Sequence, residues 1–197
     1  MNCVGQIELF HGQPGLPEGF VYQADFISAE EEGAMVREIE QLPFVAPTMH
    51  GVPAKRRTVH FGRTYDFNTF RLEAAPPVPD FLLPLRERAA SLIAHPADEL
   101  GETLVTEYLP GAGIGWHRDA PHFGIIVGIS LLAPCTMKFR RWPVQKGQAT
   151  RTRSLAQLLA PRSAYVLAGE VRTGWQHHIP PGKELRYSIT FRTLRQK

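Results

Sequence analysis

From about residue 100 onward, the sequence is a succession of short apolar stretches separated by glycine and proline. Strands of this length cannot bury a core alone, so they must pair and then stack or close on themselves. Two-residue alternation and turn signals such as Pro110-Gly111 and Pro180-Pro181-Gly182 delimit the segments. The expected strands span residues 103–108, 114–119, 125–132, 136–141, 164–168 and 186–193.

The first half of the chain shows helical periodicity instead. Ser28 and Glu31 form a capping-box pair in front of an apolar stripe, and Pro43 ends this first helix. A second helix is expected from about residue 80 to residue 95. The remaining parts are a short strand, residues 20–27, and an irregular segment, residues 43–79. Helices followed by six or more strands predict an α+β fold, an antiparallel sandwich or barrel with helices packed on one face.

The composition is that of an ordinary globular domain. Of the 197 residues 43% are hydrophobic and 21% are charged, which excludes disordered and fibrous classes. Two cysteines, Cys3 and Cys135, are too few for a disulfide scaffold, so we expect a cytoplasmic protein. No apolar run approaches the roughly 20 residues that cross a bilayer, so we expect no membrane partner. A net charge of +3 permits a polyanionic partner without requiring one.

Two segments carry a metal-ligand pattern. In Gly113-Ile-Gly-Trp-His117-Arg-Asp119, an imidazole and a carboxylate lie two residues apart and therefore face the same side of a strand. Trp175-Gln-His177-His178-Ile179 offers a second histidine. Two histidines and one carboxylate on one side of a metal are typical of non-haem Fe(II) oxygenases. The alternative is a hydrogen-bonded pair at a strand edge, because His-x-Asp is a common sequence.

The last expected strand, Arg186-Tyr-Ser-Ile-Thr-Phe-Arg192, alternates strictly between polar and apolar residues. Arg186 and Arg192 therefore share one face. This face lies in water in the simplest interpretation, but in a pocket two guanidinium groups need anionic partners. A linear diacid meets that need, since guanidinium binds carboxylate through paired hydrogen bonds. Beside an iron site, such a diacid is 2-oxoglutarate.

With these motifs, the sequence resembles the AlkB-like Fe(II)/2-oxoglutarate dioxygenases over roughly residues 20–195. The matching segments, in the family's order, are Glu107-Tyr108-Leu-Pro-Gly111, His117-Arg-Asp119, Ile129-Ser-Leu131, Trp175-Gln-His177-His-Ile179 and Arg186 to Arg192. The resemblance implies a double-stranded β-helix, or jelly-roll, core in residues 101–195. It also implies a helical and substrate-lid part in residues 20–100, both within a single domain of residues 1–197. We expect this domain to be a monomer with no obligate protein partner.

The resemblance also assigns residues to the cofactors Fe(II), 2-oxoglutarate and O2. The iron ligands would be His117, Asp119 and His177, since the family pattern Trp-x-His-x-Ile selects His177 over His178. Arg186 matches the arginine that pairs with the distal carboxylate of 2-oxoglutarate. The other co-substrate residues would be Tyr108, Arg192, Thr106 and Ser188, the last two standing where the bacterial founding member has asparagine. No further side chain is expected to act as nucleophile or base.

The implied reaction is oxidative demethylation of alkylated nucleobases in DNA or RNA, by hydroxylation of an N-methyl group and loss of formaldehyde. The basic, aromatic-rich segment from Lys55 to Arg71, with Phe61, Phe67 and Phe70, could stack a flipped base and hold phosphate. Candidate substrate residues are Arg56, Arg57, Arg63, Tyr65, Trp116 and His122.

Substrate identity is the least constrained inference, because Ala120-Pro121-His122 replaces an acidic stretch of the founding member. His122 is equally consistent with a solvated loop, and Trp116 with the core. A basic hairpin, Arg140 to Arg153, is a second candidate for phosphate contacts. Other functions remain open: hydroxylation of a tRNA modification, of a protein or of a lipid, or a catalytically silent binding module.

Overall fold

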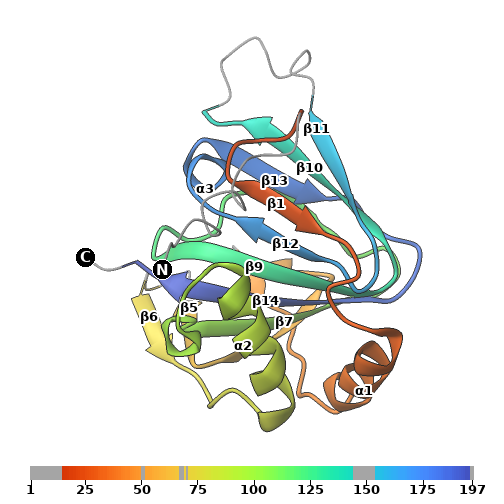
Figure 1. Ribbon diagram of the computed structural model, residues 1–197. Coiled ribbons are helices and arrows are strands. Elements are labelled where there is room, and N and C mark those ends of the chain that lie inside the picture. Colours follow the sequence, from red (N-terminus) through yellow and green to blue (C-terminus); the bar gives the residue numbers. More distant parts are fainter. Residues whose placement is uncertain (1–14, 50–51, 67–68, 70, 144–153, 196–197) are drawn as a thin grey trace.

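Two antiparallel β-sheets stacked face to face form a jelly-roll core in the computed structural model, which describes residues 15–49, 52–66, 69, 71–143 and 154–195 (Figure 1). The larger sheet has the strand order β1-β12-β9-β14-β7-β4 and the smaller one β11-β10-β13-β8. The larger sheet contains β1 (Phe20–Gln23), β12 (Ala164–Leu167), β9 (Phe123–Leu132), β14 (Arg186–Leu194), β7 (Glu102–Tyr108) and β4 (Arg57–Phe61). The smaller sheet contains β11 (Leu155–Leu159), β10 (Cys135–Arg141), β13 (Trp175–Ile179) and β8 (Ile114–His117).

Two helices cover the outer face of the larger sheet, as the sequence predicts. Helix α1 (Ala29–Ile39) begins with the expected capping box: Ser28 Oγ accepts a hydrogen bond from the Glu31 amide, and the Glu31 carboxylate accepts one from the Ser28 amide. Helix α2 (Leu83–Leu92) follows a 3-10 turn over Asp80–Leu82. A second 3-10 turn spans Ala97–Glu99, and the short helix α3 (Glu170–Thr173) precedes β13. None of the helices in the described ranges is long and apolar enough to cross a membrane.

The segment between the two helices differs from the expectation. Residues 43–79 are not irregular: β4 pairs with β7 and extends the larger sheet, and two small hairpins adjoin it. These hairpins pair β2 (Thr48–Met49) with β3 (Val52–Pro53), and β5 (Arg63–Asp66) with β6 (Arg71–Ala74). Their strands are short and polar, so apolar alternation does not reveal them. Because β4 and β1 both join the larger sheet, the residues predicted as lid and core share one sheet.

Smaller differences concern the second half of the chain. The structure adds β11 and β13 to the expected strands, and β8 ends at His117, so Asp119 lies just beyond the strand. The strand at the C-terminus follows the predicted alternation. Tyr187, Ile189 and Phe191 pack under the helices, whereas Ser188 faces the space between the sheets.

Two apolar clusters hold these layers together. One lies between the helices and the larger sheet and includes Ile39, Leu85 and Ile189. The other fills one end of the space between the sheets and includes Phe20 on β1 and Phe139 on β10. An open cavity adjoins this cluster between the sheets and is lined by both apolar and polar side chains, the polar ones including Thr106, His117, Asp119, His177 and Arg192.

Replacing Ile39 with alanine tests whether the helical layer stabilises the sheet. Ile39 is fully buried in α1, and a large-to-small change at such a site costs about 2–5 kcal/mol, although alanine is the better helix former. Urea denaturation of Ile39→Ala should report this loss. Leu158→Ala, at a side chain that is 58% exposed, should change the free energy of unfolding by much less. Equal effects of the two changes would contradict the packing described.

Candidate functional site: a metal centre between the sheets

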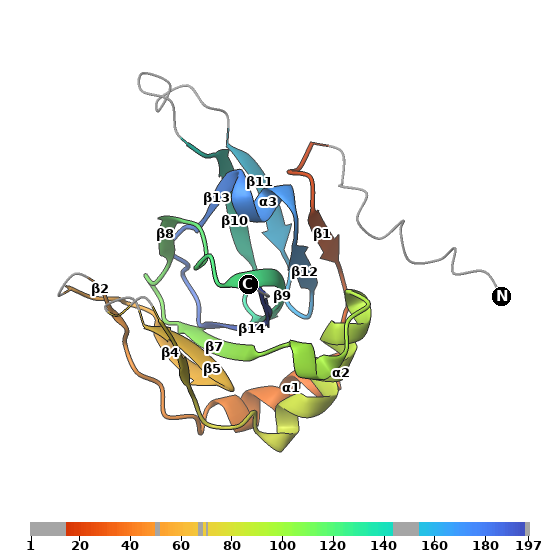
Figure 2. The same ribbon diagram turned by 90° about the vertical axis from the view of Figure 1, so that its left-hand side faces the viewer.

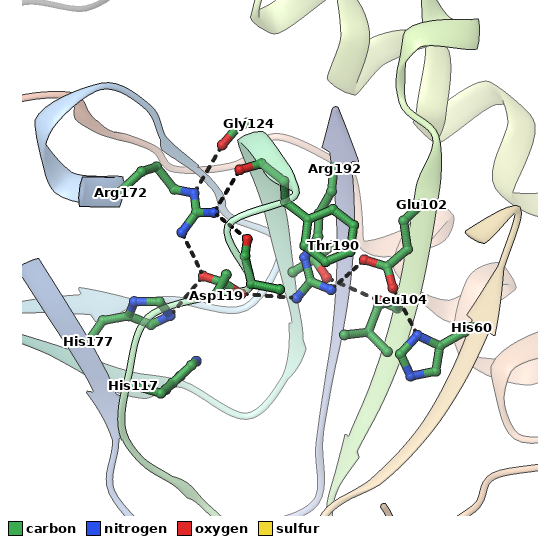
Figure 3. Close-up of polar contacts among 12 residues, drawn as sticks. His60, Glu102, Leu104, His117, Asp119, Gly124, Arg172, His177, Thr190 and Arg192 are labelled. Carbon is green, nitrogen blue, oxygen red and sulfur yellow. Dashed lines mark hydrogen bonds and ion pairs between the residues drawn. The ribbon is translucent and has the colours of Figure 1, made fainter. Parts of the chain in front are cut away.

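Three potential metal ligands converge in the cavity between the two sheets. His117 closes β8, Asp119 follows it, and His177 lies opposite His117 on β13. One ligand atom from each lies within 4.8 Å of the others, and His177 Nε2 is 3.5 Å from Asp119 Oδ2 (Figure 3). His117 Nδ1 donates to the Gly115 carbonyl oxygen at 2.9 Å, which leaves Nε2 available for a metal. The predicted three-residue set is therefore brought together at one point.

His178 points away from this centre. Its Nδ1 lies 2.6 Å from the carbonyl oxygen of Ile114, and its ring packs on Trp116 with centroids 5.1 Å apart. Consecutive residues of a strand face opposite sides, so His177 and His178 cannot both enter the site.

The electrostatics of the site favour metal binding at neutral pH. Burial lowers the pKa of His177 to about 3, an effect that His117 reinforces and Asp119 opposes. Burial also lowers the pKa of His117. Burial by itself would raise the pKa of Asp119, but His177, Arg192 and Arg172 together lower it well below its usual range. Two neutral imidazoles and one carboxylate are the ionisation states that a divalent metal requires.

Two arginines hold the carboxylate of Asp119 from different sides (Figure 3). Arg192 Nη2 lies 3.2 Å from Oδ1, and Arg172 Nη1 lies 3.4 Å from Oδ2. Arg172 is buried and also donates to the carbonyl oxygens of Phe123 and Gly124, both at 3.0 Å. It thereby fixes the segment that follows Asp119.

Arg192 continues the network into the larger sheet. Its Nη1 lies 2.6 Å from Glu102, and the Glu102 carboxylate lies 2.9 Å from His60 Nδ1. The sequence analysis did not identify Arg172, Glu102 or His60 as candidate site residues. None of the three belongs to a local motif, since their partners lie 42 to 90 residues away.

Arg186 has the features of a receptor for a carboxylate. Only 3% of it is exposed; Nε donates to Ser130 Oγ at 3.1 Å, but Nη1 and Nη2 have no hydrogen-bond partner among the described residues. A buried guanidinium without an anion is costly, so these nitrogens fit a ligand carboxylate. The Tyr108 ring lies 5.0 Å from the guanidinium and borders both the main cavity and the small cavity of about 40 Å³ beside Arg186.

The main cavity has a volume of about 430 Å³, within the range of ligand pockets. All three potential metal ligands line it, and so do the candidate co-substrate residues Thr106, Tyr108, Ser188 and Arg192. The residues fit Fe(II) and 2-oxoglutarate: the metal on the two histidines and Asp119, the diacid toward Arg186.

The predicted substrate residues separate into two groups. Those that line the cavity are Arg56, Tyr65 and Trp116. Those that do not are Arg57, Arg63 and His122. Arg57 faces the other side of β4 and pairs with Glu107 at 2.5 and 2.9 Å, Arg63 is exposed on β5, and His122 packs on the Tyr65 ring at 5.1 Å. Phe67, Phe70, Lys146, Arg151 and Arg153 lie outside the described residues.

Comparison with known proteins agrees with this geometry. A family model described as the 2OG-Fe(II) oxygenase superfamily matches residues 19–192. An "Alkylated DNA repair protein ALKBH8 homolog" of Arabidopsis thaliana is 28% identical over 92% of the chain and 56% of its own length. A "tRNA (carboxymethyluridine(34)-5-O)-methyltransferase alkbh8" of Xenopus tropicalis is 29% identical over 86% of the chain and 26% of its own length. The chain thus spans between a quarter and just over half of these relatives.

A solved structure shows the same fold. OsALKBH1 superposes with a TM-score of 0.68 over 90% of this chain and 98% of its own, at 14% sequence identity. Together with the relatives, this match supports the AlkB-like assignment that the motifs predicted.

Adjacent histidines provide a matched test of the metal centre. His177→Ala should weaken Mn(II) or Fe(II) binding by more than the 10- to 100-fold typical of losing a residue that merely orients a ligand. His178→Ala removes a hydrogen bond to Ile114 and a ring contact, but no ligand, and should retain most of the affinity. Anaerobic titration calorimetry measures both. The reverse ranking would shift the ligand assignment by one residue.

Arg186→Gln tests the carboxylate receptor. Removing one partner of a buried charge pair costs about 2–5 kcal/mol, so the Kd for 2-oxoglutarate should rise roughly 30-fold to several thousand-fold. Metal affinity should remain, because Arg186 does not contact the ligands. Lys183→Gln is the control, since Lys183 borders the same small cavity but is exposed. An unchanged Kd in Arg186→Gln, measured with Mn(II) bound, would remove the diacid from this site.

Proposed function

The chain belongs to the 2OG-Fe(II) oxygenase superfamily as an AlkB-like member, and on this premise we propose that it oxidatively demethylates modified nucleobases in RNA or DNA. The observation that carries the proposal is the composition of the cavity. Beside the metal ligands, its lining includes the aromatic side chains of Tyr65 and Trp116 and the cation Arg56. This combination suits a flat, flipped-out base attached to a phosphate backbone.

Different side chains would bind the metal, bind the co-substrate and position the metal ligands. When bound, Fe(II), 2-oxoglutarate and O2 supply the oxidation of a substrate C–H bond, with succinate and CO2 as co-products. His117, Asp119 and His177 would hold the metal, and Arg186 would orient 2-oxoglutarate by binding the distal carboxylate of this co-substrate. Arg172 and Arg192 keep the Asp119 carboxylate ionised and in place. Hydroxylation of an N-methyl group yields a product that releases formaldehyde without a side-chain base.

The relatives support a nucleic-acid substrate, since the printed names of two of them refer to alkylated DNA repair and to a modified tRNA uridine. These names also support a second candidate, hydroxylation of a tRNA modification. That product would keep an added oxygen instead of losing a methyl group, so the two reactions differ in their products and not in their cofactors.

Mass spectrometry of nucleosides decides between these functions. The protein, loaded with Fe(II) and 2-oxoglutarate, is incubated with methylated RNA and DNA oligonucleotides and with bulk tRNA, and succinate is measured in parallel. Demethylation predicts loss of the methyl group together with succinate and formaldehyde; hydroxylation predicts a stable gain of one oxygen. Succinate formed with a protein or lipid substrate alone would contradict a nucleic-acid function. No succinate with any substrate would identify a binding module.

Two adjacent arginines test the substrate assignment. Arg56 lines the cavity, whereas Arg57 is paired with Glu107 on the other side of β4. If Arg56 contacts a phosphate, Arg56→Gln should reduce the slope of log K against log salt for a single-stranded oligonucleotide by about 0.7. Arg57→Gln should leave the slope unchanged. A loss of 2-oxoglutarate affinity in Arg56→Gln with an unchanged slope would assign Arg56 to the co-substrate.

A further inference from the structure

We propose that the outward face of the smaller sheet binds the phosphate backbone of the strand that flanks the nucleotide held in the cavity. The inference rests on the proposed function and adds a second contact surface to it. We call this surface the cation–aromatic face. It consists of Trp116 on β8, Gln176 and His178 on β13, and Lys138 and Arg140 on β10.

Strand alternation directs these side chains away from the metal centre. Their neighbours that face the space between the sheets are buried: Trp175, His177 and Ile179 on β13, and Met137 and Phe139 on β10. The residues in between are only half-buried. Lys138 lies opposite His178 and Arg140 opposite Gln176, so the side chains of the two strands meet on the same outward face.

Arg140 is held in a conformation that suits phosphate binding. Its guanidinium lies over the Trp116 ring, 4.6 Å from the centroid, and its Nε donates to Gln176 Oε1 at 2.7 Å. No hydrogen bond to Nη1 or Nη2 is recorded within the described part of the chain. A stacked guanidinium presents its edge to solvent and has already lost much of its rotamer freedom, so binding a phosphate oxygen costs less entropy.

The adjacent Arg141 differs from Arg140 because its charge is balanced within the protein. It also lies over a tryptophan, Trp175, at 4.5 Å, but it forms an ion pair with Glu170. Lys138 and Arg140, by contrast, have no carboxylate within ion-pair distance among the described residues. Two cations on one face without an anion to balance them favour a polyanionic partner.

The position of Trp116 connects this face to the cavity. Trp116 lines the cavity and at the same time carries Arg140 on its ring. Its strand, β8, is the edge of the smaller sheet, across from β4 and β2 (Figure 2). A nucleic-acid strand that leaves the cavity past Trp116 therefore meets Arg140 before Lys138. Lys138 lies two residues along β10, about 6–7 Å away, which allows the two cations to contact separate phosphates.

The test compares two double variants that remove the same charge. Lys138→Gln/Arg140→Gln alters the cation–aromatic face; Arg37→Gln/Arg141→Gln removes an exposed cation of α1 and the paired neighbour of Arg140. Affinities of the metal-loaded protein with 2-oxoglutarate are measured at several salt concentrations. The probes are single-stranded oligonucleotides of increasing length that carry one methylated nucleotide.

We expect wild-type affinity to rise with oligonucleotide length, and Lys138→Gln/Arg140→Gln to lose most of this gain. For the longest probe its slope of log K against log salt should fall by about 1.4, since each lost phosphate contact contributes about 0.7. Turnover of a methylated trinucleotide and the Kd for 2-oxoglutarate should stay at wild-type values. The control variant should behave as wild type throughout.

Other outcomes distinguish a failure of this inference from a failure of the proposed function. Equal length dependence and equal slopes in both double variants would overturn the inference, while turnover of methylated oligonucleotides would leave the proposed function standing. Turnover of no oligonucleotide by the wild type would refute the proposed function itself. Loss of binding to anionic lipid vesicles in Lys138→Gln/Arg140→Gln, with oligonucleotide affinity unchanged, would assign the face to a membrane surface and overturn the inference.

Discussion

The structure depends on a network of hydrogen bonds and ion pairs that crosses the space between the two sheets. It runs from His60 on β4 through Glu102 on β7 and Arg192 on β14 to Asp119 beyond β8, and ends at Arg172 in α3 (Figure 3). Removing one member of a buried pair leaves an uncompensated charge, at a cost of about 3–5 kcal/mol. This network therefore fixes the carboxylate of Asp119, a potential metal ligand, and connects β4, β7 and β14 of the larger sheet to the segments that follow β8 and precede β13.

The balance of charge inside this region explains why Arg186 stands apart. Glu102 and Asp119 offset Arg192 and Arg172, and the buried Glu107 pairs with Arg57 on the other side of the sheet. Arg186 has a hydroxyl at Nε and no carboxylate among the described residues, although only 3% of it is exposed. A fold retains such a cation only if a ligand completes it. Under the proposed function, a carboxylate of 2-oxoglutarate would neutralise the charge that the protein leaves unmatched at Arg186.

Local patterns predicted those features whose cause is local. The alternation of Arg186 to Arg192 follows from the two-residue period of a strand, and the α1 cap follows from Ser28 and Glu31, which lie only three residues apart. Features that depend on distant partners were not predictable in this way. Glu102 and Arg172 look like ordinary surface residues until the fold brings them to Arg192 and Asp119. The same holds for β4, which is a strand because β7 offers it an edge to pair with.

Two adjacent pairs show how strongly the candidate site depends on strand register. In each pair one residue lines the cavity and the other faces away: Arg56 and Arg57, His177 and His178. Each pair consists of residues that could chemically exchange roles, such as two arginines or two histidines. A slip of one residue would therefore keep the composition of the site while turning its ligands outward. What prevents the slip is the burial of apolar residues on the same strands, Trp175 and Ile179 on β13 and Phe61 on β4, which tolerates no exchange of faces. The direction in which each polar side chain points is thus set by hydrophobic residues elsewhere on its strand.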